Sequence, residues 1–132
     1  MTDADDRHNR GAKTLEAIHG ERGARYAAEL AKFSPDFAAM LVDFAYGDVY
    51  ARPGLDPRAR QIATIAALTV LANSERELTI HIGSALRAGC TRTEVLEVIM
   101  QMAVYAGFPA ALAGLEAARN AFAADDNAPA KI

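Results

Sequence analysis

Apolar residues recur along the chain at the spacing of helix faces. Phe37, Met40, Leu41 and Phe44 lie three or four residues apart, and the same spacing recurs over 95–115. No comparable stretch alternates apolar and polar residues with the period of two that indicates a half-buried strand. The pattern therefore predicts an all-α protein. After a charged helix or tail over residues 1–20, helices are expected near 22–32, 35–51, 57–73, 75–88, 92–105 and 108–123.

Local signals mark the ends of these helices. Pro35 and Pro57 stand at the first helical position, where a missing amide hydrogen does no harm. The segments Ser-Glu-Arg-Glu at 74–77 and Thr-Arg-Thr-Glu at 91–94 match the capping box, in which hydroxyl and carboxylate satisfy each other's backbone amides. Gly89 lies between them and is typical of a left-handed helix stop.

One predicted helix is apolar on almost every side. Residues 62–72 read IATIAALTVLA, and a helix without a polar face must be covered all round. A chain of 132 residues has few helices for this task, so we expect self-association. A single central helix wrapped by its neighbours is the alternative. We expect one helical domain over 21–123 and a frayed C-terminal tail over 124–132.

Composition excludes several classes of function. The 14 basic and 17 acidic side chains give a net charge of −3 without a basic run, which argues against nucleic-acid binding. The single cysteine, Cys90, excludes an intrachain disulfide, a CxxC couple and a thiolate zinc cage. The three histidines are scattered, so no metal site is expected. The charged N-terminus and the interrupted apolar stretch over 95–115 predict a cytoplasmic protein without a membrane span.

His81 is the first candidate for chemistry. On the predicted helix 75–88 it shares a face with Leu78 and Ala85, and Glu77 lies one turn earlier. A carboxylate at that distance can fix the imidazole tautomer and favour its protonated form. His81 is therefore a candidate proton donor oriented by Glu77. The alternative is a satisfied core histidine beside a glutamate that only closes the capping box with Ser74.

A second polar cluster ends the helix that begins at Pro35. Asp48 continues an apolar row by one turn, and Tyr46, Tyr50 and Arg52 lie beside it in sequence. Polar groups at the end of an apolar row can form the rim of a pocket. Arg52, held by the following Pro-Gly turn, suits a bidentate grip on a carboxylate. A solvated helix end is the equally open alternative.

Polar residues also interrupt the apolar helix 92–105. Glu94 has a capping role, whereas Glu97 and Gln101 need hydrogen-bond partners on a largely apolar helix. Glu97 and Gln101 are therefore candidates for lining a pocket or an interface, and Tyr105 continues their row by one turn.

Two segments carry a family resemblance over approximately residues 34–123. RPGLDPRARQ at 52–61 and LTIHIGSALRAGCTRTEVLEVIMQMAVYAGFPAAL at 78–112 resemble the carboxymuconolactone decarboxylase family, which also contains the AhpD-type hydroperoxidases. The resemblance implies a compact AhpD-like helical bundle assembled as trimers or hexamers. AhpD-like members carry a CxxC pair followed four residues later by a histidine. Here Ser74 and Glu77 occupy the cysteine positions and His81 is retained, so a thiol peroxidase is disfavoured.

The decarboxylase branch implies a cofactor-independent carboxy-lyase acting on a carboxymuconolactone-like unsaturated lactone in aromatic-acid catabolism. Such a reaction needs a cation for the substrate carboxylates and an acid that reprotonates carbon. The expected catalytic residues are Arg52, Glu77 and His81, and the expected substrate-binding residues are Tyr46, Asp48, Tyr50, Gln101 and Tyr105. Two alternatives stay open, a non-catalytic oligomeric protein that binds a small molecule and a family member acting on a different carbonyl substrate.

Overall fold

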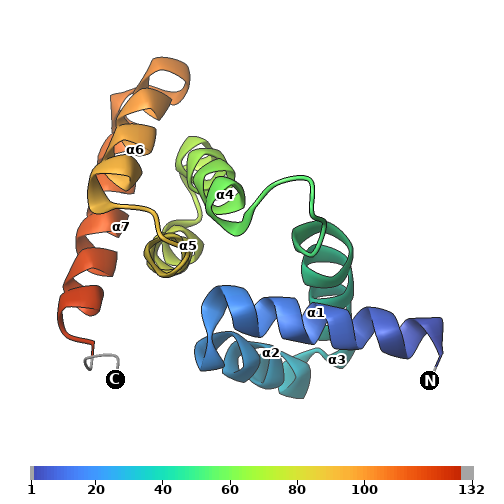
Figure 1. Ribbon diagram of the computed structural model, residues 1–132. Helices are drawn as coiled ribbons and strands as arrows, with labels where there is room; N and C mark the ends of the chain where they lie inside the picture. Colours follow the sequence, from blue (N-terminus) through green and yellow to red (C-terminus); the bar gives the residue numbers. More distant parts are fainter. Residues whose placement is uncertain (1, 129–132) are drawn as a thin grey trace. The chain divides into compact units, whose positions relative to one another are not determined.

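The computed structural model describes residues 2–128, and every regular element in this part of the chain is a helix, so the all-α class is confirmed. The chain divides into two compact units, Met1–Pro57 and Arg58–Ile132. In order, the elements are α1 (Asp3–His19), α2 (Glu21–Phe33), α3 (Pro35–Met40), the π-helix η1 (Leu41–Tyr50), α4 (Pro57–Leu71), α5 (Glu75–Arg87), α6 (Arg92–Ala106) and α7 (Phe108–Asp126) (Figure 1). The expected frayed tail is helical up to Asp126, and its last four residues lie outside the described range.

Most of the expected end signals act as predicted. Thr91 accepts a hydrogen bond from the Glu94 amide at 3.0 Å, and the Glu94 carboxylate accepts one from the Thr91 amide at 2.9 Å. Gly89 has a φ of +102°, which favours glycine. The capping box expected at Ser74 is wrong. Its backbone (φ −130°, ψ 45°) is not the extended one of Thr91 (φ −84°, ψ 159°), and its hydroxyl instead donates to Oδ1 of Asn73 at 3.0 Å.

In the first unit, α1 crosses η1 at close range. A Cβ added at Gly11 of α1 would overlap the carbonyl oxygen of Val42 in η1. A Cβ added at Gly47 of η1 would come 2.9 Å from the carbonyl oxygen of Arg7 in α1. Leu15 and Tyr46 are buried beside this crossing. The N-terminal helix is therefore part of the core of its unit rather than a detached tail.

The helix expected over 35–51 has the right extent but changes type at Leu41. Hydrogen bonds in a π-helix span five residues instead of four, so residues five apart lie one turn apart. Val42 and Gly47 therefore both face α1. Phe37 and Phe44 of the apolar row are 61% and 62% exposed, while the buried residues of η1 are Val42, Tyr46 and Gly47.

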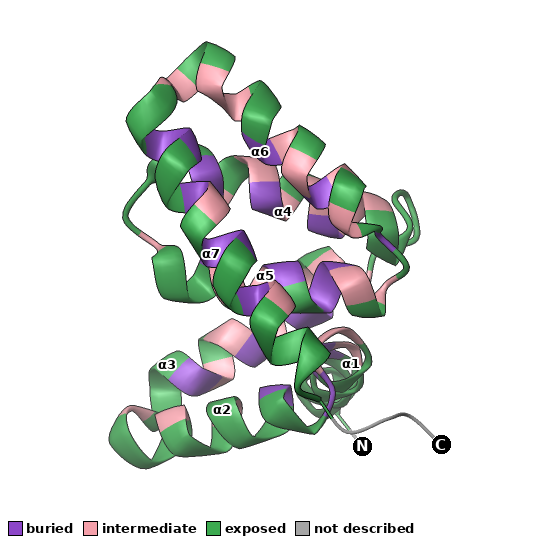
Figure 2. Ribbon diagram, turned by 90° about the vertical axis from the view of Figure 1, so that its left-hand side faces the viewer, coloured by how far each residue is buried: buried purple, intermediate pink, exposed green. Residues whose placement is uncertain are grey.

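The second unit is built on α7. Helices α5 and α6 both pack against α7 (Figure 2). The buried residues of α7 are all alanine or glycine. A Cβ at Gly114 would lie 2.9 Å from Cγ2 of Ile99 and 3.1 Å from Cγ2 of Thr69, so the glycine leaves room for these two side chains of α6 and α4. The buried core of the unit contains Ile65, Leu78, Ile82, Ala85, Cys90, Val95, Ile99, Ala111, Ala117, Ala118 and Ala121.

Helix α4 buries a single stripe. Gln61, Ile65 and Thr69 are buried at intervals of four residues, whereas Val70 and Leu71 at the end of the helix are 42% and 60% exposed. The helix that the sequence shows as apolar all round thus keeps apolar side chains on its surface. Among the described residues, no helix is long and apolar enough to cross a membrane.

Candidate functional site

Helix α5 carries His81 on its inward side, between the buried residues Leu78 and Ala85. The ring is half-buried, and its Nδ1 lies 3.0 Å from Oε1 of Gln61 on α4. Gln61 is 1% exposed. A histidine and a glutamine that are 20 residues apart in the sequence are thus joined inside the second unit.

Burial lowers the pKa of His81 from 6.5 to about 4. The ring is therefore neutral near pH 7, because the charged form loses more solvation on burial than the neutral form. This corrects the expectation that Glu77 would favour the protonated ring. Glu77 is exposed, and Gln61 is bonded to Nδ1.

Gln61 is the residue of this pair that the sequence analysis missed as a site residue. A signal for it is present in the sequence: Gln61, Ile65 and Thr69 recur at intervals of four, so a polar amide lies on the inward stripe of an apolar helix. A buried amide on such a stripe needs a hydrogen-bond partner. The identity of that partner depends on how α4 and α5 meet.

A pocket of about 230 Å³ lies at the junction of α4, α5 and α7. Its walls include Leu68, Leu78 and Gly114, and Asn73, Ser74 and Glu75 add polar groups at the start of α5. His81 is one turn beyond Leu78 on α5 and is not part of the lining. Ala72, also in the lining, has a φ of +58°, a strained conformation for a residue other than glycine.

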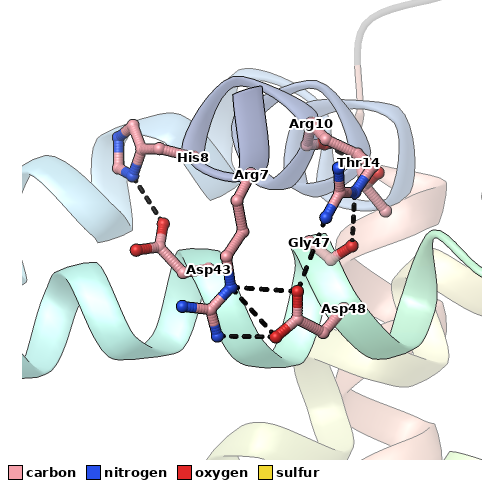
Figure 3. A network of polar contacts seen from close by, with 7 residues as sticks. All are labelled: Arg7, His8, Arg10, Thr14, Asp43, Gly47 and Asp48. Carbon is pink, nitrogen blue, oxygen red and sulfur yellow. Dashed lines mark hydrogen bonds and ion pairs between the residues drawn. The ribbon is translucent and has the colours of Figure 1, made fainter. Parts of the chain in front are cut away.

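In the first unit, Asp48 is engaged by helix α1 (Figure 3). Arg7 Nε lies 3.0 Å from both carboxylate oxygens, Arg7 Nη2 lies 2.5 Å from Oδ2, and Arg10 Nη2 lies 3.5 Å from Oδ1. Arg10 also donates to the carbonyl of Gly47 at 2.7 Å. The hydrogen bond from Arg7 lowers the pKa of Asp48. The carboxylate expected at a pocket rim therefore holds α1 against η1.

The tyrosines of η1 form a buried cluster. Tyr46 is 7% exposed, its hydroxyl oxygen lies 2.8 Å from Nε2 of His19, and burial raises the pKa of its phenol. Tyr50 stacks on Tyr46 with ring centroids 5.4 Å apart. Arg52 follows η1 with an exposed side chain, and its amide donates to the Val49 carbonyl at 3.1 Å.

The remaining expected site residues lie on the surface of α6. Gln101 is exposed and Tyr105 is 75% exposed. Of the residues predicted from sequence, the structure thus joins Tyr46 with Tyr50 and gives His81 and Asp48 partners that were not predicted.

Cys90 is buried, with Sγ 3.9 Å from the Arg58 carbonyl oxygen.

Comparison with known proteins gives concordant matches. A family model described as the carboxymuconolactone decarboxylase family matches residues 35–120. The chain is 33% identical to the 4-carboxymuconolactone decarboxylase of Acinetobacter baylyi, over 97% of this chain and 96% of that protein. It is 36% identical to an uncharacterized 15.0 kDa protein of Paracoccus denitrificans, over 72% of each. It is also 33% identical to a nitrosuccinic acid decarboxylase of Metarhizium robertsii, over 55% of this chain and 50% of that protein.

Proposed function

Because the chain belongs to the carboxymuconolactone decarboxylase family, we propose that it removes CO₂ from a carboxylated unsaturated lactone in aromatic-acid catabolism. The relative named for a carboxymuconolactone matches almost end to end, whereas the one named for nitrosuccinic acid matches over half of its length. The first name describes an acid with a lactone carbonyl, and the second an acid with a nitro group. Either group can take up negative charge. The extent of the first match favours the lactone.

The observation that carries the proposal is the half-buried His81, held by Gln61 and neutral at rest. An anionic substrate nearby raises the pKa of an imidazole, so His81 takes up a proton when the substrate binds. The bond between carbon and carboxylate then breaks, and its electron pair moves into a dienolate that spreads onto the lactone carbonyl. His81 returns its proton to carbon, and one proton from water is consumed for each CO₂ released.

We place the apolar body of the substrate in the pocket at the junction of α4, α5 and α7, with its reacting carbon beyond Leu78, toward His81 on the next turn of α5. Leu68 and Leu78 give it apolar walls, which favour loss of a charged carboxylate, and the side-chain amide of Asn73 offers hydrogen-bond donors. Ala113 lines this pocket and is exposed, so Ala113→Leu narrows it without burying a new polar group. We expect this variant to raise KM. An unchanged KM would place the substrate elsewhere.

The direct test is incubation of the purified protein with a panel of unsaturated lactone acids and 3-oxo acids, followed by ultraviolet absorbance and CO₂ trapping. We expect His81→Gln to lower kcat by roughly a hundredfold or more, the usual contribution of a proton-transferring group. Gly83→Ala on the same helix is the matched control, because its Cβ enters open space. Saturable binding without CO₂ would instead support a non-catalytic binding or accessory protein, and turnover of a 3-oxo acid alone would indicate a different carbonyl substrate.

Arg52, in the first unit, stays a residue predicted from the sequence to grip a substrate carboxylate. Arg52→Lys keeps the charge but removes the planar fork, so it is expected to raise KM more than it lowers kcat. Tyr50, Gln101 and Tyr105 stay predicted substrate contacts that the same assay tests by truncation. Glu77→Gln is expected to leave the pKa of His81 in place, because burial is the cause of that shift.

A thiol mechanism is separated from this proposal by Cys90→Ser. The thiol is buried and contacts a backbone carbonyl, and no second cysteine is present in the sequence. We expect decarboxylation to persist in this variant. Hydroperoxide reduction that disappears with the substitution would instead indicate a single-cysteine peroxidase.

We also propose that the second unit associates with further copies of the chain. Apolar side chains remain exposed along α6 and α7, including Val104 at 77%, Phe108 at 74% and Leu112 at 60%. Exposed apolar surface of this kind is typical of a protein interface. Light scattering after size exclusion is expected to give a trimer or hexamer, and a 14 kDa species would contradict self-association.

A further inference from the structure

The amide of Gln61 meets the ring of His81 through its oxygen. Oε1 lies 3.0 Å from Nδ1, and an amide oxygen only accepts hydrogen bonds. With the amide in this orientation, Nδ1 carries the hydrogen. In a neutral imidazole the other nitrogen, Nε2, then holds the lone pair.

We propose that Gln61 is a positioning residue that holds His81 in the tautomer protonated at Nδ1, so that Nε2 receives and returns the proton. The part that concerns proton transfer rests on the proposed function, whereas the tautomer itself does not. When Nε2 gains a proton, the bond from Nδ1 to Gln61 is kept. The ring therefore carries out both steps without turning.

The position of Gln61 suits this task. Its side chain is 1% exposed, on the same buried stripe of α4 as Ile65 and Thr69, so the amide has little freedom to move away. The amide is also uncharged. It orients the ring without raising the pKa of His81 as a carboxylate would, so His81 stays neutral before the substrate binds.

Packing alone does not account for a glutamine at this position. Among the described residues, Nε2 of Gln61 is buried without a hydrogen-bond partner, and such a group costs roughly 1–3 kcal/mol. Methionine has a similar length and shape and would fill the same space without this penalty. Gln61→Met removes the unpartnered Nε2 but also the acceptor of His81 Nδ1, so the two effects oppose each other and the melting temperature is expected to change little.

The first test reads the tautomer directly, in protein without substrate. Long-range proton–nitrogen spectra at pH 7 distinguish the two ring nitrogens, and the signals of His81 are identified by their loss in His81→Gln. We expect a protonated Nδ1 and an unprotonated Nε2 in the wild-type chain. A wild-type spectrum with the proton on Nε2 of His81 would overturn the proposal, whatever the activity.

The second test uses two substitutions of Gln61. Gln61→Met removes the acceptor, so the Nδ1-protonated pattern should disappear and kcat should fall by at least about tenfold with little change in KM. Gln61→Glu restores an acceptor at the same place, so the pattern should return, with a higher pKa for His81. An unchanged tautomer in Gln61→Met would refute the positioning role.

The two proposals can fail separately. The expected spectra together with no CO₂ release from any substrate would leave Gln61 as the residue that sets the tautomer and would refute the decarboxylase. Release of CO₂ with kcat unaffected by Gln61→Met would support the enzyme and refute the role of Gln61 in proton transfer. The control Gly83→Ala should alter neither the spectrum nor kcat, because it adds a methyl group in open space on α5.

Discussion

Gly11 of α1 lies directly on the backbone carbonyl of Val42 in η1, with no space for a side chain between the two helices. On the η1 side, Gly47 is similarly close to the Arg7 carbonyl. Two glycines thus allow a charged N-terminal helix to pack as part of a core.

Gly11→Ala is expected to destabilise the chain by about 2 kcal/mol, within the range found for overpacking, because the new Cβ would overlap the Val42 carbonyl. Urea denaturation followed by circular dichroism measures the change. Gly83→Ala is expected to stabilise the chain instead, because its Cβ meets open space and alanine in a helix is favoured over glycine by roughly 0.5–1 kcal/mol. Equal stability of Gly11→Ala and the wild-type chain would show that α1 does not pack on η1 in solution.

Asp48→Asn is expected to lower the melting temperature at low salt, with a smaller effect at high salt. The carboxylate is paired with both Arg7 and Arg10, and salt screens such exposed charges. Its folded pKa is lowered, so the stabilisation is present above the unfolded pKa near 3.8 and is lost as pH falls through the folded value. Glu29→Gln breaks one largely exposed pair with Lys32 and should have little effect on the melting temperature. A larger loss for Glu29→Gln than for Asp48→Asn would contradict this role of the network.

The stability of the wild-type chain is expected to fall between pH 6.5 and pH 4 through His81. The folded pKa of about 4 lies below the unfolded value of 6.5, so the unfolded chain binds the proton first as pH drops. By pH 4, this difference in proton binding is expected to have lowered the free energy of unfolding by about 3 kcal/mol. His81→Gln lacks this titration, so the difference in unfolding free energy between the two chains should change with pH. If the unfolding free energies of the two chains changed with pH in parallel, the ring would not be buried.

Binding of an anionic lactone is expected to be accompanied by proton uptake near pH 6. His81 is neutral before binding, and the negative charge of the ligand raises its pKa. A saturated lactone dicarboxylate, which has no conjugated system to accept the electron pair, serves as a ligand that does not react. Titration calorimetry in two buffers of different ionisation enthalpy measures the protons taken up. Uptake of the same size in His81→Gln would assign the proton to another group.

Helix limits were largely predictable from the sequence, because the signals that set them act within a few residues. The capping box of Thr91 and Glu94, the glycine at position 89 and the prolines at positions 35 and 57 lie at the observed helix ends. Ser74 shows the limit of such signals. Its motif is local, but the backbone leading into α5 does not aim the hydroxyl at the helix.

The partners of the site residues were decided by tertiary structure. Asp48 meets Arg7 across 41 residues, and His81 meets Gln61 across 20. Apolar spacing alone placed His81 on an inward face, because helical periodicity depends only on the order of residues. Which polar group would face the ring, and whether burial or a neighbouring charge would set its pKa, depended on how α4 packs beside α5. Solvation and hydrogen bonding act through space between such elements, so the neutral state of His81 follows from the fold and not from the glutamate one turn away.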